Sequence, residues 1–102
     1  MYESDTIFYE KINKKPYIQL KKINSGGSST VFQVLNEQNE VLALKCVDLK
    51  NATTEQYTSF VNEVKLLETL RGSPGIIYLV DYELDRTENV LKIVLLFNVY
   101  DV

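Results

Sequence analysis

Histidine is absent from the 102-residue chain, and this absence excludes several kinds of chemistry. Imidazole acid–base catalysis, Ser-His-Asp triads and histidine-ligated metal sites all need a residue that the sequence lacks. Cys46 is the single cysteine, so the chain cannot form an internal disulfide and gives no sign of an oxidising compartment. The same two counts exclude a structural zinc site, and we expect no metal site. Lysines, carboxylates and backbone amides are left to carry any chemistry.

The sequence also lacks a membrane-spanning apolar run and an excess of basic charge. No apolar stretch is long enough to cross a bilayer, and residues 1–5 lack the basic start and apolar core of a signal peptide. The formal net charge is -3, and no basic stripe collects that would neutralise phosphates. We therefore expect a cytosolic or nuclear protein with no nucleic-acid and no membrane partner.

The length and composition predict one small globular domain. A chain of 102 residues supports a single core, and 45% hydrophobic with 25% charged residues is ordinary for a soluble unit. Residues 1–16 are polar with scattered apolar positions, and we interpret them as an N-terminal extension that ends at Pro16. Residues 17–102 are then the domain.

The hydrophobic pattern predicts five strands and one helix. Strands are expected over residues 17–23, 30–35, 41–49, 76–84 and 90–97, and turn formers break the pattern from Asn24 to Ser29. The strand over 41–49 is apolar at both parities, which is typical of an interior strand. Residues 54–70 change to a spacing of three and four, with Thr53 and Gln56 as a capping box and Gly72 as a stop. The predicted fold class is α+β, a five-stranded antiparallel sheet with one main helix.

Three elements of this pattern carry candidate chemistry. Ser25-Gly26-Gly27-Ser28-Ser29 is a small-residue loop whose backbone N–H groups could approach phosphate oxygens, although such clusters also mark plain hairpin turns. Lys45 is, in our interpretation, the only lysine embedded in a core strand. It needs an anion there unless it snorkels to water.

Glu63 is the third element, in the helix that follows. At about 100° per residue, Phe60 and Leu67 lie about 60° and 40° away from it around the helix axis. The carboxylate is thus placed within the apolar face and needs a partner, unless it is half exposed at the edge of that face. We predict an ion pair between Lys45 and Glu63.

These residues resemble the start of a protein kinase domain. The run from Ile23 to Val34, followed by Ala43-Leu44-Lys45, is most similar to the monopolar-spindle (TTK) dual-specificity kinases. In that family the glycine-rich loop ends in Gly-Gly-Ser-Ser. Tyr17, Asn62-Glu63 and Asp81-Tyr82-Glu83 are also similar to the family. The resemblance covers residues 12–102, all of it within the amino-terminal lobe.

The resemblance implies that ATP is the cofactor and assigns its binding residues. Ile23 and Val31 would lie over the adenine with Ala43 in the roof, and the backbone of the loop would cover the phosphates. Lys45 would bind the α- and β-phosphates, held by Glu63. Leu95 would be the gatekeeper residue and Leu96 to Asn98 the hinge. The complete set of expected cofactor-binding residues is Ile23, Asn24, Ser25, Gly26, Gly27, Ser28, Ser29, Val31, Ala43, Lys45, Leu95 and Phe97.

The sequence departs from the family at three points. Asn24 stands for the first glycine of the loop, and Leu96 stands where glutamate is usual in the hinge. The third departure is larger, because the chain contains neither the His-Arg-Asp catalytic loop nor the Asp-Phe-Gly motif that binds magnesium. We therefore expect an isolated amino-terminal lobe, cut short before the carboxy-terminal lobe, and Mg²⁺ binding only where that second lobe is present.

Two functional hypotheses follow. The first is the ATP-binding lobe of a TTK-like kinase that phosphorylates protein substrates in the spindle checkpoint at kinetochores and is inactive alone. The second is a non-catalytic interaction module, in which a protein partner covers the exposed face of the lobe.

Overall fold

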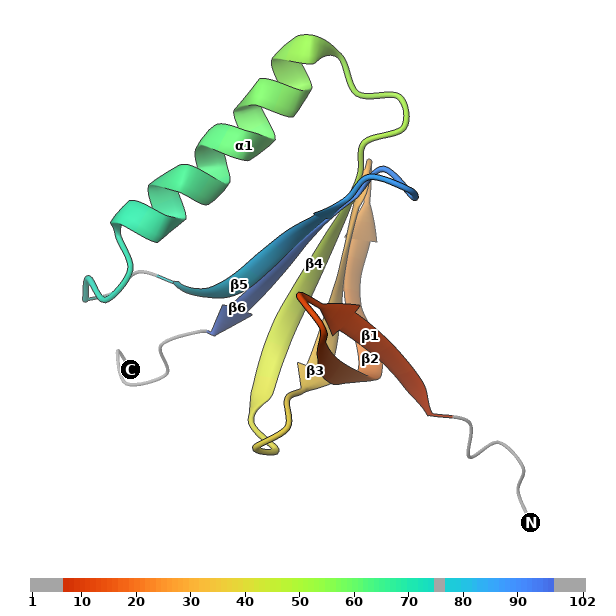
Figure 1. The fold of residues 1–102 in the computed structure, drawn as a ribbon, viewed down its shortest axis with the longest axis vertical. Helices are drawn as coiled ribbons and strands as arrows, with labels where there is room; N and C mark the ends of the chain where they lie inside the picture. Colours follow the sequence, from red (N-terminus) through yellow and green to blue (C-terminus); the bar gives the residue numbers. More distant parts are fainter. Residues whose placement is uncertain (1–6, 75–76, 97–102) are drawn as a thin grey trace.

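A computed structural model describes residues 7–74 and 77–96 of the chain. Its elements are β1 (Phe8–Ile12), β2 (Lys15–Gly26), β3 (Ser29–Leu35), β4 (Val41–Asp48), α1 (Thr54–Thr69), β5 (Tyr78–Asp85) and β6 (Val90–Leu96). The strands form one antiparallel sheet in the order β1-β2-β3-β4-β6-β5, and α1 lies along one side of it (Figure 1). None of the described residues belong to a helix with the length and hydrophobicity that a membrane crossing needs.

The sheet has six strands in the described residues, so the predicted count of five is wrong. The additional strand, β1, lies within residues 1–16, and Asn13 and Lys14 join it to β2. These two residues have φ angles of 51° and 71°, the left-handed pair that a tight two-residue hairpin turn requires. Asparagine tolerates this conformation but lysine seldom adopts it, so the sequence carried only half of the usual turn signal. The α+β class with one helix is confirmed.

Strand β4 lies inside the sheet, as predicted, and has a hydrophobic core on each face. We call the first the hairpin-side core: it consists of the buried residues Ile12, Tyr17, Val34, Leu42, Leu44 and Val94. The second is the helix-side core: it consists of Val47, Leu49, Val64, Leu79, Leu91 and Ile93. Because successive side chains of a strand point to opposite faces, β4 supplies residues to both cores. The β1–β2 hairpin covers one face and α1 the other.

The ends of α1 are fixed by the residues that the sequence singled out and by one that it did not. The Thr53 side chain accepts a hydrogen bond from the Gln56 N–H while the Gln56 side chain accepts one from Thr53, which confirms the capping box. After the helix, Gly72 has a φ of 91°, a conformation that favours glycine. Arg71 then donates from Nε to the Leu79 carbonyl at 2.8 Å, which attaches the end of the helix to β5.

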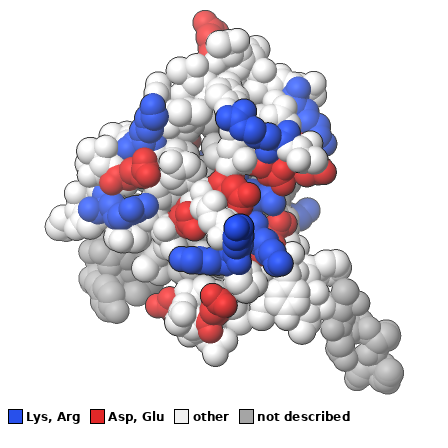
Figure 2. Space-filling view, in the orientation of Figure 1, with Lys and Arg blue, Asp and Glu red and all other residues white. Residues whose placement is uncertain are grey.

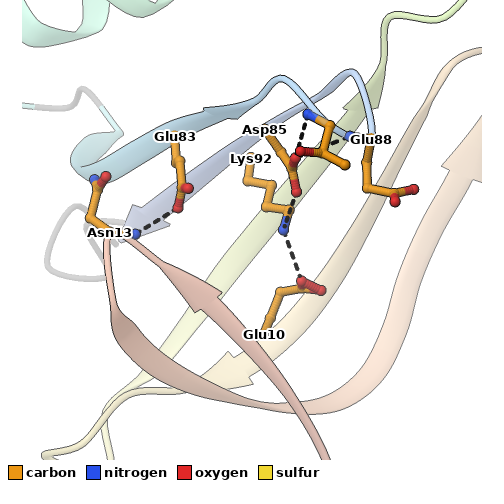
Figure 3. Close-up of polar contacts among 7 residues, drawn as sticks. Glu10, Asn13, Glu83, Asp85, Glu88 and Lys92 are labelled. Carbon is orange, nitrogen blue, oxygen red and sulfur yellow. Dashed lines mark hydrogen bonds and ion pairs between the residues drawn. The ribbon is translucent and has the colours of Figure 1, made fainter.

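Polar contacts join β1 and the turn that follows it to β6 and β5, at the other end of the sheet order (Figure 3). The ammonium of Lys92 on β6 lies 3.2 Å from Glu10 on β1 and 3.5 Å from Asp85 on β5. At the hairpin turn, the Asn13 N–H donates to the Glu83 carboxylate at 2.7 Å. The sheet is therefore curled so that β1 comes close to β5, its opposite edge. Elsewhere on the face seen in Figure 2, acidic and basic side chains are interspersed.

We expect the Lys92 ion pairs to make stability depend on pH. The Glu88 N–H, with Lys92 and the Thr87 N–H, holds the pKa of Asp85 below its ordinary 3.8 against a smaller effect of burial. Burial alone would lower the pKa of Lys92, but Glu10 and Asp85 outweigh it and raise that pKa above 10.5. The stabilisation is thus fully present between these two ordinary values. It is lost as pH falls through the lowered pKa of Asp85 or rises through the raised pKa of Lys92.

Urea unfolding followed by circular dichroism from pH 7 to pH 2.5 checks this. Lys92→Met should lessen the acid decline of the unfolding free energy, because Asp85 then loses the part of its pKa lowering that Lys92 supplies, while the larger part from the Glu88 N–H remains. Exposed Lys50 provides the control, and Lys50→Met should keep the wild-type decline. Equal declines in all three proteins would contradict the assignment.

Candidate functional site

The Gly/Ser loop is the end of the β2–β3 hairpin. Strand pairing continues to Gly26 opposite Ser29, so only Gly27 and Ser28 interrupt the strands, a shorter break than the predicted span from Asn24 to Ser29. Gly27 has a φ of 56°, which glycine adopts without strain. A Cβ atom added at Gly26 or Gly27 would meet no atom within 4 Å, so the outer side of this turn is open.

Two hydrogen bonds that the sequence did not reveal shape this loop. The Asp48 N–H at the end of β4 donates to the Ser28 carbonyl at 2.7 Å, which holds the turn against the sheet. The Asn24 side-chain oxygen accepts from the Ser25 N–H at 2.8 Å, a short-range bond that glycine at this position could not make. A polar cleft of about 300 Å³ separates the turn from the start of α1; its lining residues are Gly27, Ser28, Asp48, Asn51, Ala52, Gln56 and Phe60.

Lys45 lies near the middle of β4, on the face that carries α1. Its backbone neighbours are Val31 on β3 and Ile93 on β6, so apolar residues flank it on both sides. The side chain is 27% exposed, which is enough for its ammonium to reach the edge of the helix-side core. The strand thus presents one positive charge close to the base of the Gly/Ser hairpin.

Glu63 on α1 faces this charge. Its Oε2 lies 3.8 Å from the Lys45 ammonium, which confirms the predicted ion pair. The argument that led to the prediction needs a correction, because Glu63 is 46% exposed and lies at the edge of the apolar face. Its neighbour Val64 is buried, and Phe60 and Leu67 pack on the same core. These three side chains fix the rotation of the helix, and that rotation points Glu63 towards β4.

The interpretation that Lys45 is the only lysine embedded in a core strand is wrong. Lys92 on β6 is less exposed, at 16%, and lies on the opposite face of the sheet with two carboxylates within 4 Å. Because Lys92 alternates with Leu91 and Ile93 along β6, the sequence predicts that its side chain points away from the helix-side core. The two carboxylates that it meets come from other strands, β1 and β5. Without β1 in the predicted fold, this partner set could not be anticipated.

The residues expected around an adenine lie on adjacent strands. Ala43 is buried and pairs with Leu95 on β6, and Val31 is the backbone partner of Lys45. Ile23 is the additional residue of a β-bulge, since its two neighbours pair with consecutive residues of β3, and it is 53% exposed. Val31, Ala43, Lys45 and Leu95 therefore gather on one surface; the expected contacts of Phe97 and Asn98 lie outside the described residues.

The ammonium of Lys45 has donor capacity left to hold an anion. A lysine ammonium has three donors, and one half-exposed carboxylate leaves capacity for further acceptors. No group of three or more metal-ligating side chains occurs among the residues that the structure describes. The site is thus a cationic point between an open Gly/Ser turn and an apolar strand surface, with a geometry suited to a phosphate joined to a flat apolar group.

The Lys45–Glu63 pair should contribute little to stability. Exposed ion pairs near the 4 Å limit stabilise by less than about 1 kcal/mol. We therefore expect Lys45→Met and Glu63→Gln each to change the free energy of unfolding by less than about 1 kcal/mol, measured by urea titration. For comparison, Leu44→Ala in the hairpin-side core should cost roughly 2–5 kcal/mol. A loss of comparable size in either charge variant would contradict the weak-pair interpretation.

Comparison with known proteins also identifies similarity to protein kinases. A family profile described as "Protein kinase domain" matches residues 17–99. The chain is 44% identical over 85 residues to mouse (Mus musculus) "Dual specificity protein kinase TTK", across 82% of this chain and 10% of that protein.

Two further relatives are named as MPS1 kinases. The Saccharomyces cerevisiae "Serine/threonine-protein kinase MPS1" is 34% identical over 73 residues, 72% of this chain and 10% of that protein. The protein of that name in Encephalitozoon cuniculi is 40% identical over 76 residues, 74% of this chain and 12% of that protein. The chain spans about a tenth of the length of the curated relatives that it matches.

Proposed function

The chain belongs to the protein kinase family, and we propose that it is the ATP-binding amino-terminal lobe of a TTK-like dual-specificity kinase. The observation that carries the proposal is the Lys45–Glu63 pair, 3.8 Å apart beside the Gly/Ser hairpin. The similarity to relatives named as TTK and MPS1 kinases supports the class of reaction, which is phosphorylation of serine, threonine and tyrosine in protein substrates.

The residues present fit a nucleotide. Lys45 would bind the α- and β-phosphates, and Glu63 would keep its ammonium near the strand. The backbone of the loop from Ser25 to Ser29 would cover the phosphates, since its turn is open on the outer side. Ile23, Val31, Ala43 and Leu95 would contact the adenine, with Phe97 in the hinge. ATP supplies the phosphoryl group when bound, and Mg²⁺ would be held by residues of a carboxy-terminal lobe.

We expect ATP to stabilise the chain through Lys45. In differential scanning fluorimetry, millimolar ATP should raise the Tm of the wild type, and Lys45→Met should abolish the rise because the phosphates lose their cation. We expect at best millimolar affinity, since one lobe provides only one side of the adenine pocket. Lys11→Met removes an exposed lysine on β1, a strand that supplies none of the assigned binding residues, and should leave the rise intact. A rise that survives Lys45→Met would contradict the assigned role.

Phosphotransfer should not occur in these 102 residues. They contain no His-Arg-Asp aspartate to accept the substrate proton and no Asp-Phe-Gly aspartate to bind magnesium. Purified chain incubated with labelled ATP, Mg²⁺ and a generic protein substrate should incorporate label only at background level. Incorporation that is lost in Lys45→Met would show that the chain is an active kinase and overturn this expectation.

A second candidate function is a protein-binding module. Ile23, Leu66 and Leu96 are large apolar residues that are 53%, 57% and 40% exposed, so the lobe carries apolar surface that a partner could cover. The two functions differ in one measurement. Partner binding at micromolar strength that neither ATP nor Lys45→Met changes would favour the module over the nucleotide-binding lobe.

The cellular setting of the proposal is the spindle checkpoint. We also propose that the chain is a nuclear or cytoplasmic protein that acts at kinetochores, as its resemblance to the TTK family implies. Fluorescence imaging of the tagged chain in mitotic cells tests this, and exclusion of the chain from kinetochores would count against it.

A further inference from the structure

Strand β5 contains a β-bulge at Val80 that lies between the two cores. Leu79 pairs with Leu95, whereas Asp81 pairs with the very next residue of β6, Val94, so Val80 is the extra residue. Leu79 is fully buried in the helix-side core. Val80 packs against the hairpin-side core. A displacement of this bulge would therefore disturb both covers of the sheet.

The β1–β2 hairpin holds the bulge from one side. Besides the bond from its backbone N–H to Glu83, Asn13 donates from Nδ2 to the Asp81 carboxylate at 2.7 Å and to the Tyr82 carbonyl at 2.8 Å. One residue thus binds three consecutive positions of β5, directly after the bulge. Figure 3 shows Asn13 at the tip of the hairpin, reaching β5 beside Glu83.

Helix α1 holds the bulge from the other side. Arg71, just beyond the helix, donates to the Leu79 carbonyl at 2.8 Å, and its guanidinium lies 5.6 Å from the centre of the Tyr78 ring. Within the helix, Val64 and Leu67 pack on the core that contains Leu79. β5 is the strand against which α1 packs. The position of α1 therefore depends on where this segment of β5 lies.

We propose that Asn13 is a positioning residue for the nucleotide site: it fixes the β5 bulge, the bulge fixes α1, and α1 fixes Glu63 against Lys45. The need for such a support follows from the ion pair itself. At 3.8 Å and with Glu63 nearly half exposed, the pair is too weak to hold the helix in place. The nucleotide part of this inference rests on the proposed function; the mechanical part, from Asn13 to α1, does not.

The test uses Asn13→Gly in the full chain. Glycine accepts the φ of 51° and keeps the backbone bond to Glu83, so this variant removes only the two side-chain hydrogen bonds. Asn39→Gly is the matched control, because Asn39 also has a left-handed φ, of 64°, in the turn between β3 and β4. Any effect of glycine on a hairpin turn as such would appear in both variants.

Amide hydrogen exchange is the first readout and needs no nucleotide. Asn13→Gly should speed exchange in the second half of α1 about fivefold or more relative to the amides of β4, as expected for the loss of one or two hydrogen bonds. Asn39→Gly should not. If exchange in α1 keeps pace with that of β4 in Asn13→Gly, the loss of stability is global and the proposal is overturned.

ATP affinity, measured by NMR titration, is the second readout. Asn13→Gly should weaken ATP binding about fivefold in the wild-type background and less than twofold in a Glu63→Gln background, since Asn13 is inferred to act through Glu63. Equal weakening in both backgrounds would overturn the positioning role. If the wild-type chain binds no ATP, the proposed function fails, and the exchange measurement still decides whether Asn13 positions α1.

Exchanging the hydrogen-bond partners gives a rescue. Asn13→Asp places a carboxylate against Asp81 and Glu83 and should disturb α1 more than Asn13→Gly does. Asn13→Asp combined with Asp81→Asn restores one donor and one acceptor at this contact and should recover part of the slow exchange. A double variant that exchanges as fast as Asn13→Asp alone would contradict the direct contact.

Discussion

Strand β4 carries apolar side chains on both of its faces, and the other elements are arranged to cover them. Leu42 and Leu44 belong to one core and Val47 to the other, so no single layer can remove all of this surface from water. α1 covers one face and the β1–β2 hairpin the other. Lys45 reaches Glu63 because α1 packs on the face of the sheet that carries Lys45. The N-terminal hairpin is therefore as much a part of the lobe as the helix.

Local patterns in the sequence predicted most of the fold and the central contact of the site. The helix could be predicted because its capping box and its spacing of three and four are local, and the interior strand because both its parities are apolar. β1 could not, since Lys14 occupies a left-handed turn position and Glu10 has its partner, Lys92, far along the chain. The bulges at Ile23 and Val80 could not be predicted either, because they depend on the pairing register between strands. The sequence of one strand does not specify that register.

The correct prediction of the Lys45–Glu63 pair followed from a premise that the structure revises. Glu63 was expected to need a partner because of burial, yet it lies half exposed at the edge of the helix face. In such a position water can solvate the carboxylate, so the ion pair is not required by folding. Folding does not require this interaction, but the packing of Phe60, Val64 and Leu67 nevertheless aligns it, which agrees with the nucleotide-binding role that we propose for Lys45.

The two strand lysines show how this distinction can be drawn from contacts alone. Lys92 has carboxylates at 3.2 and 3.5 Å from two different strands, so its donors are used within the fold and its charge is neutralised there. Within residues 7–74 and 77–96, Lys45 has one carboxylate within 4 Å, farther away at 3.8 Å, and its side chain is more exposed. The first arrangement holds the cation between two acidic residues of the fold. The second leaves a cation with free donor capacity beside an open turn. Of these two lysines, Lys45 is therefore the one that we propose to contact the phosphates of a nucleotide.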